Sequence, residues 1–283
     1  MVNITDEALE RWLKEDIPYM DLTTYLLDIV EKDGEMHFFS RDEAVLCGTE
    51  EVARLTVLKG GEVLEYLPSG SKISPGEIFM KVAGKAGVLH LLWKTSQNIL
   101  EYASGIASRT HRLVEKARKV NEKVSILSTR KVFPGTKELS IKAVLCGRGL
   151  PHRLGLSESI LIFKQHRVFD SSWDKPAAII EQLKIKSCEK KVVVEIEQPE
   201  EAIPLCKAGV DGLQFDKLPP EKLVDLVKVI KKDFPQILCI AAGGINEDNV
   251  EQYAATGVDA IVSTSMYFGR PVNIGVTMKD PKA

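Results

Sequence analysis

The sequence has few cysteines, no long apolar run and almost no net charge. Its five cysteines are scattered and form no Cys-x-x-Cys pair, so a structural zinc site is not expected and reduced thiols in a cytoplasm are the plain interpretation. No apolar stretch approaches the about 20 residues that a membrane span needs, and the first residues carry acids where a signal peptide has an apolar core. We therefore expect a cytoplasmic protein with no membrane partner.

The charge balance also argues against a general nucleic-acid binder. The chain has 38 Lys and Arg against 40 Asp and Glu, for a net charge of -2. Any cationic patch must then be local, and a local patch suits a small anion. With 283 residues, of which 44% are hydrophobic, one large domain or two ordinary ones can bury a core.

From residue 124 onward, short apolar runs alternate with stretches of helical periodicity. Several of these stretches begin with proline, as at Pro176, Pro199 and Pro219. A strand-helix-strand order repeated six times predicts parallel pairing through crossover helices, in either a barrel or a doubly wound sheet. The apolar runs are residues 124–128, 159–163, 191–197, 211–215, 237–242 and 259–263.

The first hundred residues have a different pattern. The runs "EMHFFS", "EAVLCG", "EVLEYL" and "EIFMKVAG" predict short strands separated by turns, and a long helical region follows over about 86–120. Gly105 interrupts that region and is expected to divide it into two helices. We predict an N-terminal α+β domain over 1–108 and an α/β barrel domain over 109–266, with the tail 267–283 packing back on the first domain.

Charged and small residues follow the predicted barrel strands. In a βα barrel, the carboxyl ends of the strands and their loops form the active face. The residues expected to meet there combine cations, carboxylates and Gly- or Ser-rich turns, which suits a phosphorylated, metal-chelating substrate. They are Ser128–Lys131, Lys164–Arg167, Glu195, Glu197, Asp216, Lys217, "AAGGIN" at 241–246 and "VSTS" at 262–265.

Each of these features also has a purely structural interpretation. An Arg-Lys pair in a loop is usually a solvated surface, and a glycine turn alone is a weak phosphate motif. Glu195 is more informative, because a carboxylate in an apolar strand needs a cation, a metal or ribose hydroxyls as its partner. An ion pair of Glu195 with Arg130 or Lys131 is the structural alternative. The convergence of several loops, rather than any single motif, predicts the site.

These residues resemble the quinolinate phosphoribosyltransferase family. The segment 128–169, "STRKVFPGTKELSIKAVLCGRGLPHRLGLSESILIFKQHRVF", is similar to the family's D-T-R-K-T-x-P-G, C-G-G-G-x-x-H-R-x-G-L and L-I-K-x-N-H patterns. "DIPYMDLTT", "LEYASGIASRTHRLVE" and the later strands match in order, so the resemblance covers nearly the whole chain. It is strongest to the ModD-type branch associated with molybdenum transport, and the molybdenum link rests on that resemblance alone.

The resemblance implies a fold, an assembly and a reaction. The fold would be an N-terminal α/β sandwich followed by an incomplete, six- to seven-stranded α/β barrel. The assembly would be a homodimer, or a higher oligomer, in which one subunit's N-terminal domain covers the other's barrel mouth. The reaction would transfer phosphoribose from phosphoribosyl pyrophosphate, with Mg²⁺, to a ring nitrogen of a small heterocyclic acid. Fixed carboxylates would stabilise the oxocarbenium-like ribose as pyrophosphate leaves.

The resemblance also implies roles for particular residues. The catalytic candidates are Lys131, Glu195 and Asp216, and the last two are the candidate Mg²⁺ ligands. Cationic candidates would bind the acid and the phosphates, and the glycine and hydroxyl turns would hold the 5′-phosphate. The substrate-binding candidates are Lys94, Thr129, Arg130, Arg148, His152, Arg153, Lys164, Ala242, Gly243, Gly244, Ser263 and Thr264.

Several positions depart from the family pattern. Lys94 aligns with a family Arg and Phe163 with a family Lys, while Arg148, Ala242 and Thr264 replace small family residues. One lost charge-assisted hydrogen bond is worth roughly 1.5–3 kcal/mol, so we expect phosphoribosyl binding to be kept more securely than quinolinate recognition. Two alternatives stay open: an authentic carboxylating nicotinate-nucleotide pyrophosphorylase of NAD biosynthesis, and a non-catalytic barrel that senses a phosphoribosyl ligand.

Overall fold

The computed structural model describes residues 2–281, which fall into two compact units. The first unit comprises Met1–His111, Val132–Arg148 and Tyr267–Ala283, and the second comprises Arg112–Lys131 and Gly149–Met266. The sequence pattern predicts residues 132–148 to be part of the barrel domain, whereas they cluster with the first unit. The reason is hydrophobic packing, because Ala143 is buried in one cluster with Val45, Cys47 and Ala103 of that unit.

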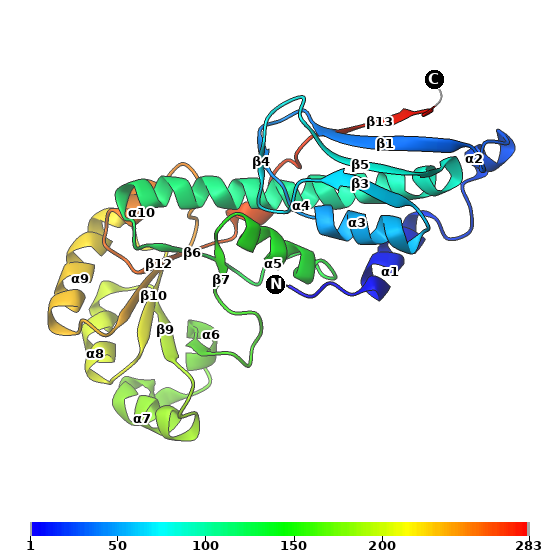
Figure 1. Cartoon of the computed structure of the whole chain (residues 1–283). Helices are drawn as coiled ribbons and strands as arrows, with labels where there is room; N and C mark the ends of the chain where they lie inside the picture. Colours follow the sequence, from blue (N-terminus) through cyan, green and yellow to red (C-terminus); the bar gives the residue numbers. More distant parts are fainter. Residues whose placement is uncertain (1, 282–283) are drawn as a thin grey trace. The chain divides into compact units, whose positions relative to one another are not determined.

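The first unit is built on an antiparallel sheet with the strand order β13-β1-β5-β3 (Figure 1). β13 pairs with β1 from Glu35↔Lys279 to Ser40↔Ile274, so the C-terminal tail forms an edge strand of this sheet. Met36 and Phe38 of β1 are fully buried, as alternation along a strand with one core face requires. The strands of this unit are β1 (Asp33–Ser40), β2 (Ala44–Val45), β3 (Glu62–Tyr66), β4 (Lys72–Ile73), β5 (Ile78–Lys85) and β13 (Ile274–Lys279).

Five helices begin in this part of the chain. Thr5 caps the first of them by accepting a hydrogen bond from the backbone N–H of Ala8 through its side chain, and the helix buries Leu9 and Leu13. The helices are α1 (Asp6–Asp16), α2 (Leu22–Leu26), α3 (Thr49–Leu58), α4 (Ala86–Val120) and α5 (Lys137–Cys146).

The expected break at Gly105 is wrong, because α4 is one continuous helix of 35 residues. A Cβ on Gly105 would lie 3.2 Å from the Cα of Pro271 and 3.4 Å from the backbone nitrogen of Val272. Glycine at this position therefore admits the close approach of the C-terminal tail. A helix interior tolerates one glycine at a cost of about 1 kcal/mol relative to alanine.

The second unit is a parallel sheet with the strand order β7-β6-β12-β11-β10-β9-β8. Every pairing in it is parallel, and within residues 2–281 its end strands β7 and β8 each pair on one side only, so the sheet is a half-barrel. This confirms the predicted incomplete barrel. The strands are β6 (Ser125–Ser128), β7 (Leu150–Pro151), β8 (Ile160–Ile162), β9 (Val192–Ile196), β10 (Gly212–Asp216), β11 (Leu238–Ala242) and β12 (Ala260–Ser263).

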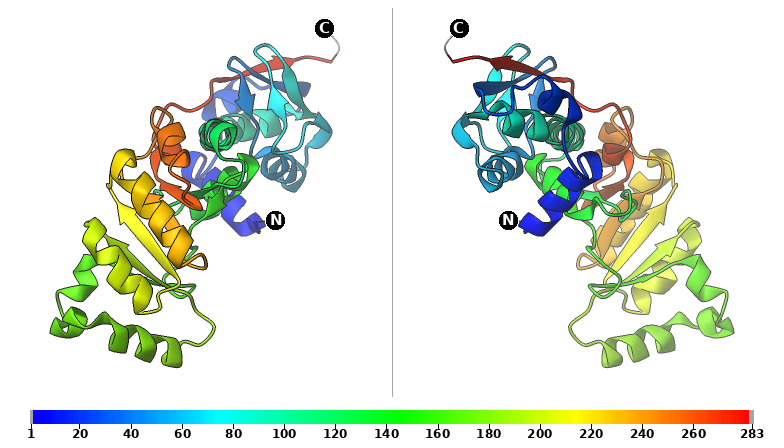
Figure 2. Two further views of the ribbon diagram at one scale, coloured as in Figure 1. Left: turned by 90° about the vertical axis from the view of Figure 1, so that its left-hand side faces the viewer. Right: turned by 90° about the vertical axis from the view of Figure 1, so that its right-hand side faces the viewer.

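Helices cover the outer face of these strands, as both further views show (Figure 2). α9 buries Leu223, Val227 and Ile230, whose spacing places them on one helix face. Pro176 and Pro220 stand at the first position of their helices, where a missing N–H does no harm. The helices are α6 (Lys164–Arg167), η1 (Ser171–Asp174), α7 (Pro176–Lys186), η2 (Pro199–Glu201), α8 (Ala202–Lys207), α9 (Pro220–Asp233), α10 (Val250–Ala254) and η3 (Ser265–Tyr267).

The inner face of the half-barrel is apolar below the carboxyl ends of its strands. Leu161, Val193, Ile240, Ala260 and Val262 form one buried cluster there. The inner face thus carries a hydrophobic floor on which polar side chains at the strand ends can stand. Within residues 2–281, none of the helices combines the length and apolar character that a membrane crossing requires.

Candidate functional site

A pocket of about 690 Å³ opens at the carboxyl ends of the parallel strands. It lies within the second unit, and its volume is typical of a site for a small organic ligand. Of the residues predicted to be catalytic or substrate-binding, the structure brings together there all except Lys94, Arg148 and Lys164. The strand-end pattern also predicts five further residues at this face that do not line the pocket, namely Ser128, His166, Arg167, Glu197 and Ala241. The predicted residues that line it are Thr129, Arg130, Lys131, His152, Arg153, Glu195, Asp216, Ala242, Gly243, Gly244, Ser263 and Thr264.

The three exceptions have other surroundings. Lys94 belongs to the first unit, where its ammonium donates to Gln97 at 3.2 Å and lies 4.4 Å from the Trp93 ring. Arg148 also belongs to the first unit and has a positive φ of 65°.

Lys164 is the clearest correction among the three. Its side chain is 63% exposed and pairs with Glu197 at 3.1 Å, while Phe163 lines the pocket. Neighbouring residues of an extended chain point to opposite sides, so only one of this pair can face the ligand.

Glu195 occupies the inner face of β9 and is held by Gln214 of β10. The two residues are register partners, and Nε2 of Gln214 donates to Oε2 of Glu195 at 2.5 Å. Within residues 2–281, no ion pair joins Glu195 to Arg130 or Lys131, so the simple structural role considered for this carboxylate is not what the structure has. Burial raises the pKa of the Glu195 carboxyl, while the Gln214 hydrogen bond lowers it.

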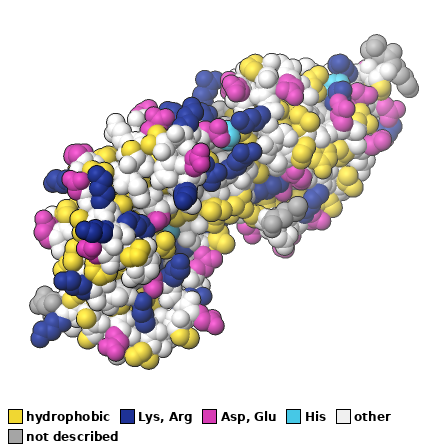
Figure 3. All heavy atoms as spheres, turned by 60° about the vertical axis from the view of Figure 1, so that its left-hand side comes forward, with side chains coloured by type: hydrophobic (Ala, Val, Ile, Leu, Met, Phe, Trp, Pro, Cys, Tyr) yellow, Lys and Arg dark blue, Asp and Glu magenta, His cyan; other side chains and the backbone are white. Residues whose placement is uncertain are grey.

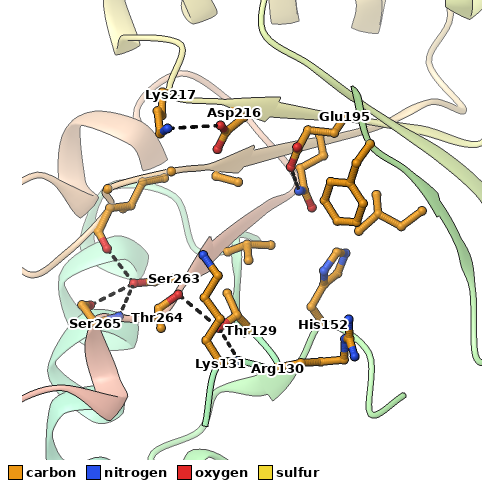
Figure 4. Close-up of a pocket in the computed structure, with 18 of the residues that line it drawn as sticks. Thr129, Arg130, Lys131, His152, Glu195, Asp216, Lys217, Ser263, Thr264 and Ser265 are labelled. Carbon is orange, nitrogen blue, oxygen red and sulfur yellow. Dashed lines mark hydrogen bonds and ion pairs between the residues drawn. The ribbon is translucent and has the colours of Figure 1, made fainter. Parts of the chain in front are cut away.

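Three cations face the pocket without an acidic partner. Within the described chain, Arg130, Lys131 and Arg153 form no ion pair with an Asp or Glu side chain. Arg153 is only 9% exposed, and burial together with the nearby Arg130 lowers its pKa. Burial and the charge of Arg153 also lower the pKa of His152. Such a cluster is completed by an anion, and Figure 4 shows the Lys131 ammonium pointing into the middle of the pocket.

The glycine turn after β11 fits directly against the β10 strand end. Gly243 has a φ of +92°, and a Cβ there would lie 2.6 Å from Oδ1 of Asp216 and 2.6 Å from Cγ of Lys217. The backbone N–H of Lys217 donates to the carbonyl of Ala242 at 2.8 Å, which locks the two strand ends together. Glycine is therefore required at this position, and its substitution would displace the Asp216 carboxylate.

A second turn, after β12, is held by hydroxyl groups. Ser263 donates to the carbonyl of Ile245 at 2.6 Å and accepts from the backbone N–H of Ser265 at 3.0 Å. The hydroxyls of Thr129 and Thr264 lie 3.1 Å apart. Figure 4 shows these hydroxyl groups on the side of the pocket away from Glu195 and His152. The pocket therefore has a small-residue end and an end with an acid, an aromatic and cations.

Sequence reasoning missed Gln214, which lines the pocket and is 4% exposed. Its signal was present in "DGLQF", where a polar residue interrupts an apolar strand, as Glu195 does in "VVVEIE". A neutral amide attracts less attention than a carboxylate, although both need partners when buried.

The carboxylates fit a cation that arrives with its substrate. Glu195 and Asp216 supply oxygen ligands, and no group of three or more His, Cys, Asp or Glu within the described residues could hold a metal by itself. Mg²⁺ is typically bound by one or two carboxylates together with substrate phosphates. The donor set is thus compatible with Mg²⁺ carried by a polyphosphate.

Comparison with known families decides the relationship. The sequence matches the family described as quinolinate phosphoribosyl transferase, N-terminal domain, over residues 21–104 and the corresponding C-terminal domain over residues 106–275. The chain belongs to the quinolinate phosphoribosyl transferase family. This confirms the resemblance drawn from the sequence and makes the protein an enzyme of the phosphoribosyltransferase type.

Individual relatives match most of the length of this chain. A Rhodobacter capsulatus protein provisionally named pyrophosphorylase ModD is 38% identical over 88% of this chain and 95% of its own. An Archaeoglobus fulgidus protein provisionally named carboxylating nicotinate-nucleotide pyrophosphorylase is 32% identical over 87% of this chain and 93% of its own. The solved nicotinate-nucleotide pyrophosphorylase of Francisella tularensis has the same fold, with a TM-score of 0.89, 22% identity and 98% of both chains covered.

Proposed function

We propose that the protein transfers phosphoribose from phosphoribosyl pyrophosphate to a ring nitrogen of a small heterocyclic acid and releases pyrophosphate. The observation that carries the proposal is that one pocket contains both cations without acidic partners and two carboxylates. Cations without carboxylate partners would bind phosphates and an acid. Carboxylates beside them would stabilise positive charge where it develops, as it does on ribose when pyrophosphate leaves.

Each end of the pocket would then bind a different part of the substrates. The turns at Gly243–Gly244 and Ser263–Thr264 would hold the 5′-phosphate, because small residues and hydroxyls allow close approach of the phosphate oxygens. Arg130 and Lys131 would contact the leaving pyrophosphate, and Arg153 would pair with the acid group of the acceptor. Glu195 and Asp216 would bind the ribose hydroxyls and stabilise the cationic ribose electrostatically.

Mg²⁺ is part of the proposal as a companion of the donor substrate. Glu195 and Asp216 would hold it together with the substrate's phosphates, and when bound it supplies positive charge to the departing pyrophosphate. The Lys217 ammonium lies 3.8 Å from the Asp216 carboxylate and leaves it accessible to such an ion. We assign no molybdenum-binding role to the pocket.

We also propose a homodimer in the cytoplasm. Residues 19–27 expose Tyr19 by 95%, Leu26 by 70% and Leu27 by 62%, and a cluster of apolar side chains this exposed is typical of an interface. In such a dimer, Lys94 would be the residue that one copy contributes to the other's pocket. All five cysteines are unpaired, in keeping with a reducing compartment.

Pyrophosphate release tests the proposal. The purified protein is given phosphoribosyl pyrophosphate and Mg²⁺ with quinolinate, other pyridine acids or azole acids in turn. Lys131→Ala should abolish release, while Lys228→Ala, at an exposed lysine on α9, should leave it unchanged. Tight binding of phosphoribosyl pyrophosphate without release under any acceptor would instead support the sensing alternative. Quinolinate as the best acceptor would identify an authentic enzyme of NAD biosynthesis.

A further inference from the structure

Phe163, Glu195 and Gln214 form a row across three neighbouring strands at one end of the pocket. Ile162 of β8 is the register partner of Val194, so Phe163 follows at the level of Glu195. Glu195 is in turn the partner of Gln214. All three side chains line the pocket. They stand directly above the apolar floor formed by Leu161 and its neighbours.

The Phe163 ring gives this end of the pocket a flat wall. It stacks with the His166 ring at a centroid distance of 5.6 Å and an angle of 23°. The Arg153 guanidinium lies 5.8 Å from its centroid and has no acidic partner within residues 2–281. An aromatic wall beside a largely buried, unpaired cation suits a flat ring that carries one acid group.

Gln214 leaves a hydrogen-bond acceptor unused in the same place. Its amide N–H donates to the Glu195 carboxylate, which fixes the carbonyl oxygen on the other side. That Oε1 atom is buried and has no hydrogen-bond partner within the described structure. Because unsatisfied buried acceptors are uncommon and unfavourable, a ligand group that donates a hydrogen bond would complete this position.

A second carboxylate on the ligand ring would be poorly placed here. Beside Phe163 it would meet the Glu195 carboxylate and the Gln214 carbonyl, which are both acceptors, and Phe163 offers no charge to balance it. An N–H, amino or hydroxyl substituent meets the same two groups as a donor. The row therefore distinguishes a donor substituent from an acid substituent.

We infer that the acceptor is a planar heteroaromatic monocarboxylate with a ring N–H, amino or hydroxyl donor, and that Phe163 and Gln214 determine this specificity. The inference rests on the proposed function only in calling this acid the acceptor. The single carboxylate would pair with Arg153, and the donor substituent would bond to Oε1 of Gln214.

Calorimetric binding of three matched acids, without phosphoribosyl pyrophosphate, tests the inference. The acids are pyridine-3-carboxylate, 2-aminopyridine-3-carboxylate and pyridine-2,3-dicarboxylate, which differ only in the substituent at one ring carbon. The wild-type protein should bind 2-aminopyridine-3-carboxylate at least about tenfold more tightly than pyridine-2,3-dicarboxylate, since one charge-assisted hydrogen bond is worth that factor or more. Phe163→Lys should reverse this order of affinities. Gln214→Met should lower the affinity for 2-aminopyridine-3-carboxylate to that for pyridine-3-carboxylate.

A second variant separates specificity from folding. Phe163→Leu keeps the position apolar, so it should weaken the binding of all three acids alike without changing the order of their affinities. Thermal denaturation shows whether each of the three variants folds. The inference would be overturned by any of three results. These are equal or tighter binding of pyridine-2,3-dicarboxylate by the wild type, an unchanged order of affinities in Gln214→Met, or no binding of any of the three acids. Failure of pyrophosphate release would refute the transferase function and leave the order of affinities standing, so the two failures are distinguishable.

Discussion

Replacing Gly243 by alanine should damage the protein far more than the same change at Gly244. Both glycines have positive φ, +92° and +73°, so an alanine at either position is strained by roughly 1–2 kcal/mol. Only Gly243 is crowded as well. A Cβ there would lie 2.6 Å from Oδ1 of Asp216 and 2.7 Å from the backbone nitrogen of Lys217, whereas a Cβ on Gly244 meets nothing within 4 Å.

The magnitude follows from adding the two effects. Forcing an extra methyl group against fixed backbone costs typically about 1–3 kcal/mol. Gly243→Ala should therefore lower the free energy of unfolding by roughly 2–5 kcal/mol, against roughly 1–2 kcal/mol for Gly244→Ala. The close contact is partly with a carboxylate oxygen, so relaxation of the structure would also move Asp216 away from its place in the pocket.

Thermal and urea denaturation of the two variants, compared with the wild type, measure this difference directly. Each kcal/mol should lower the midpoint temperature by roughly 2–4 °C in a unit of this size. Equal losses of stability in the two variants would refute the reasoning, because backbone strain alone would then explain both. A stable Gly243→Ala protein would show that the β10 and β11 strand ends are not packed as described.

The remaining predictions concern charge and pH. Lys142→Met removes the largely buried ammonium that lies 2.7 Å from Glu50 and also pairs with the buried Glu51, and urea denaturation should show a loss of about 3 kcal/mol. Lys85→Met, in an exposed pair, should lose much less stability. Burial opposes ionisation of Glu50, but hydrogen bonds from Lys142 and Ser69 outweigh it and lower its pKa to about 2. The pKa of Glu50 is thus lower in the folded than in the unfolded protein, so the stability that its ionised form contributes is present above about pH 4.5 and is lost as the pH falls from there towards 2. Melting curves across that range should show this loss in the wild type and little of it in Lys142→Met. Burial raises the pKa of Glu195, so the acidic limb of kcat/KM should lie above that of an ordinary carboxylate and rise further in Gln214→Met, whereas a downward move would contradict the ionised role of Glu195.

The barrel could be predicted from the sequence because its signals are local and repeated. Each apolar run after residue 124 is followed by a helical stretch, and proline at Pro176 and Pro220 marks where two of the helices begin. Placing polar residues at the carboxyl ends of parallel strands then brought Lys131, Glu195 and Asp216 into one pocket. These inferences need only the order of residues along the chain.

Most of the errors concern contacts between residues that are far apart in the sequence, and one concerns the direction of a side chain at a strand end. Gly105 alone suggests a helix break. Its contact with Pro271, which is distant in the sequence, explains why a glycine stands within a continuous helix. Lys164 was assigned to the pocket although its strand neighbour Phe163 already faces it. Gln214 was missed because its role depends on its register with Glu195, which the sequence does not reveal.

Surface charge gives no further guide to the site. On the face shown in Figure 3, cationic and acidic side chains are intermixed, in keeping with the net charge of -2. The cations that matter are distinguished by lining the pocket without an acidic partner among the described residues, as Arg153 does, rather than by their number. This supports a small anionic substrate over an extended polyanion.

The measurement that tests the central claim most directly is pyrophosphate release by Glu195→Gln, made alongside the affinity for phosphoribosyl pyrophosphate with Mg²⁺. The substitution keeps the size of the side chain and the partner Gln214 but removes the charge proposed to stabilise the cationic ribose. The account predicts that the maximal rate of release falls by about a hundredfold or more while the affinity falls by a much smaller factor, as expected for an interaction that is stronger in the transition state than in the bound substrate. A variant that releases pyrophosphate at the wild-type rate would contradict the claim that this pocket performs the transfer through its carboxylates.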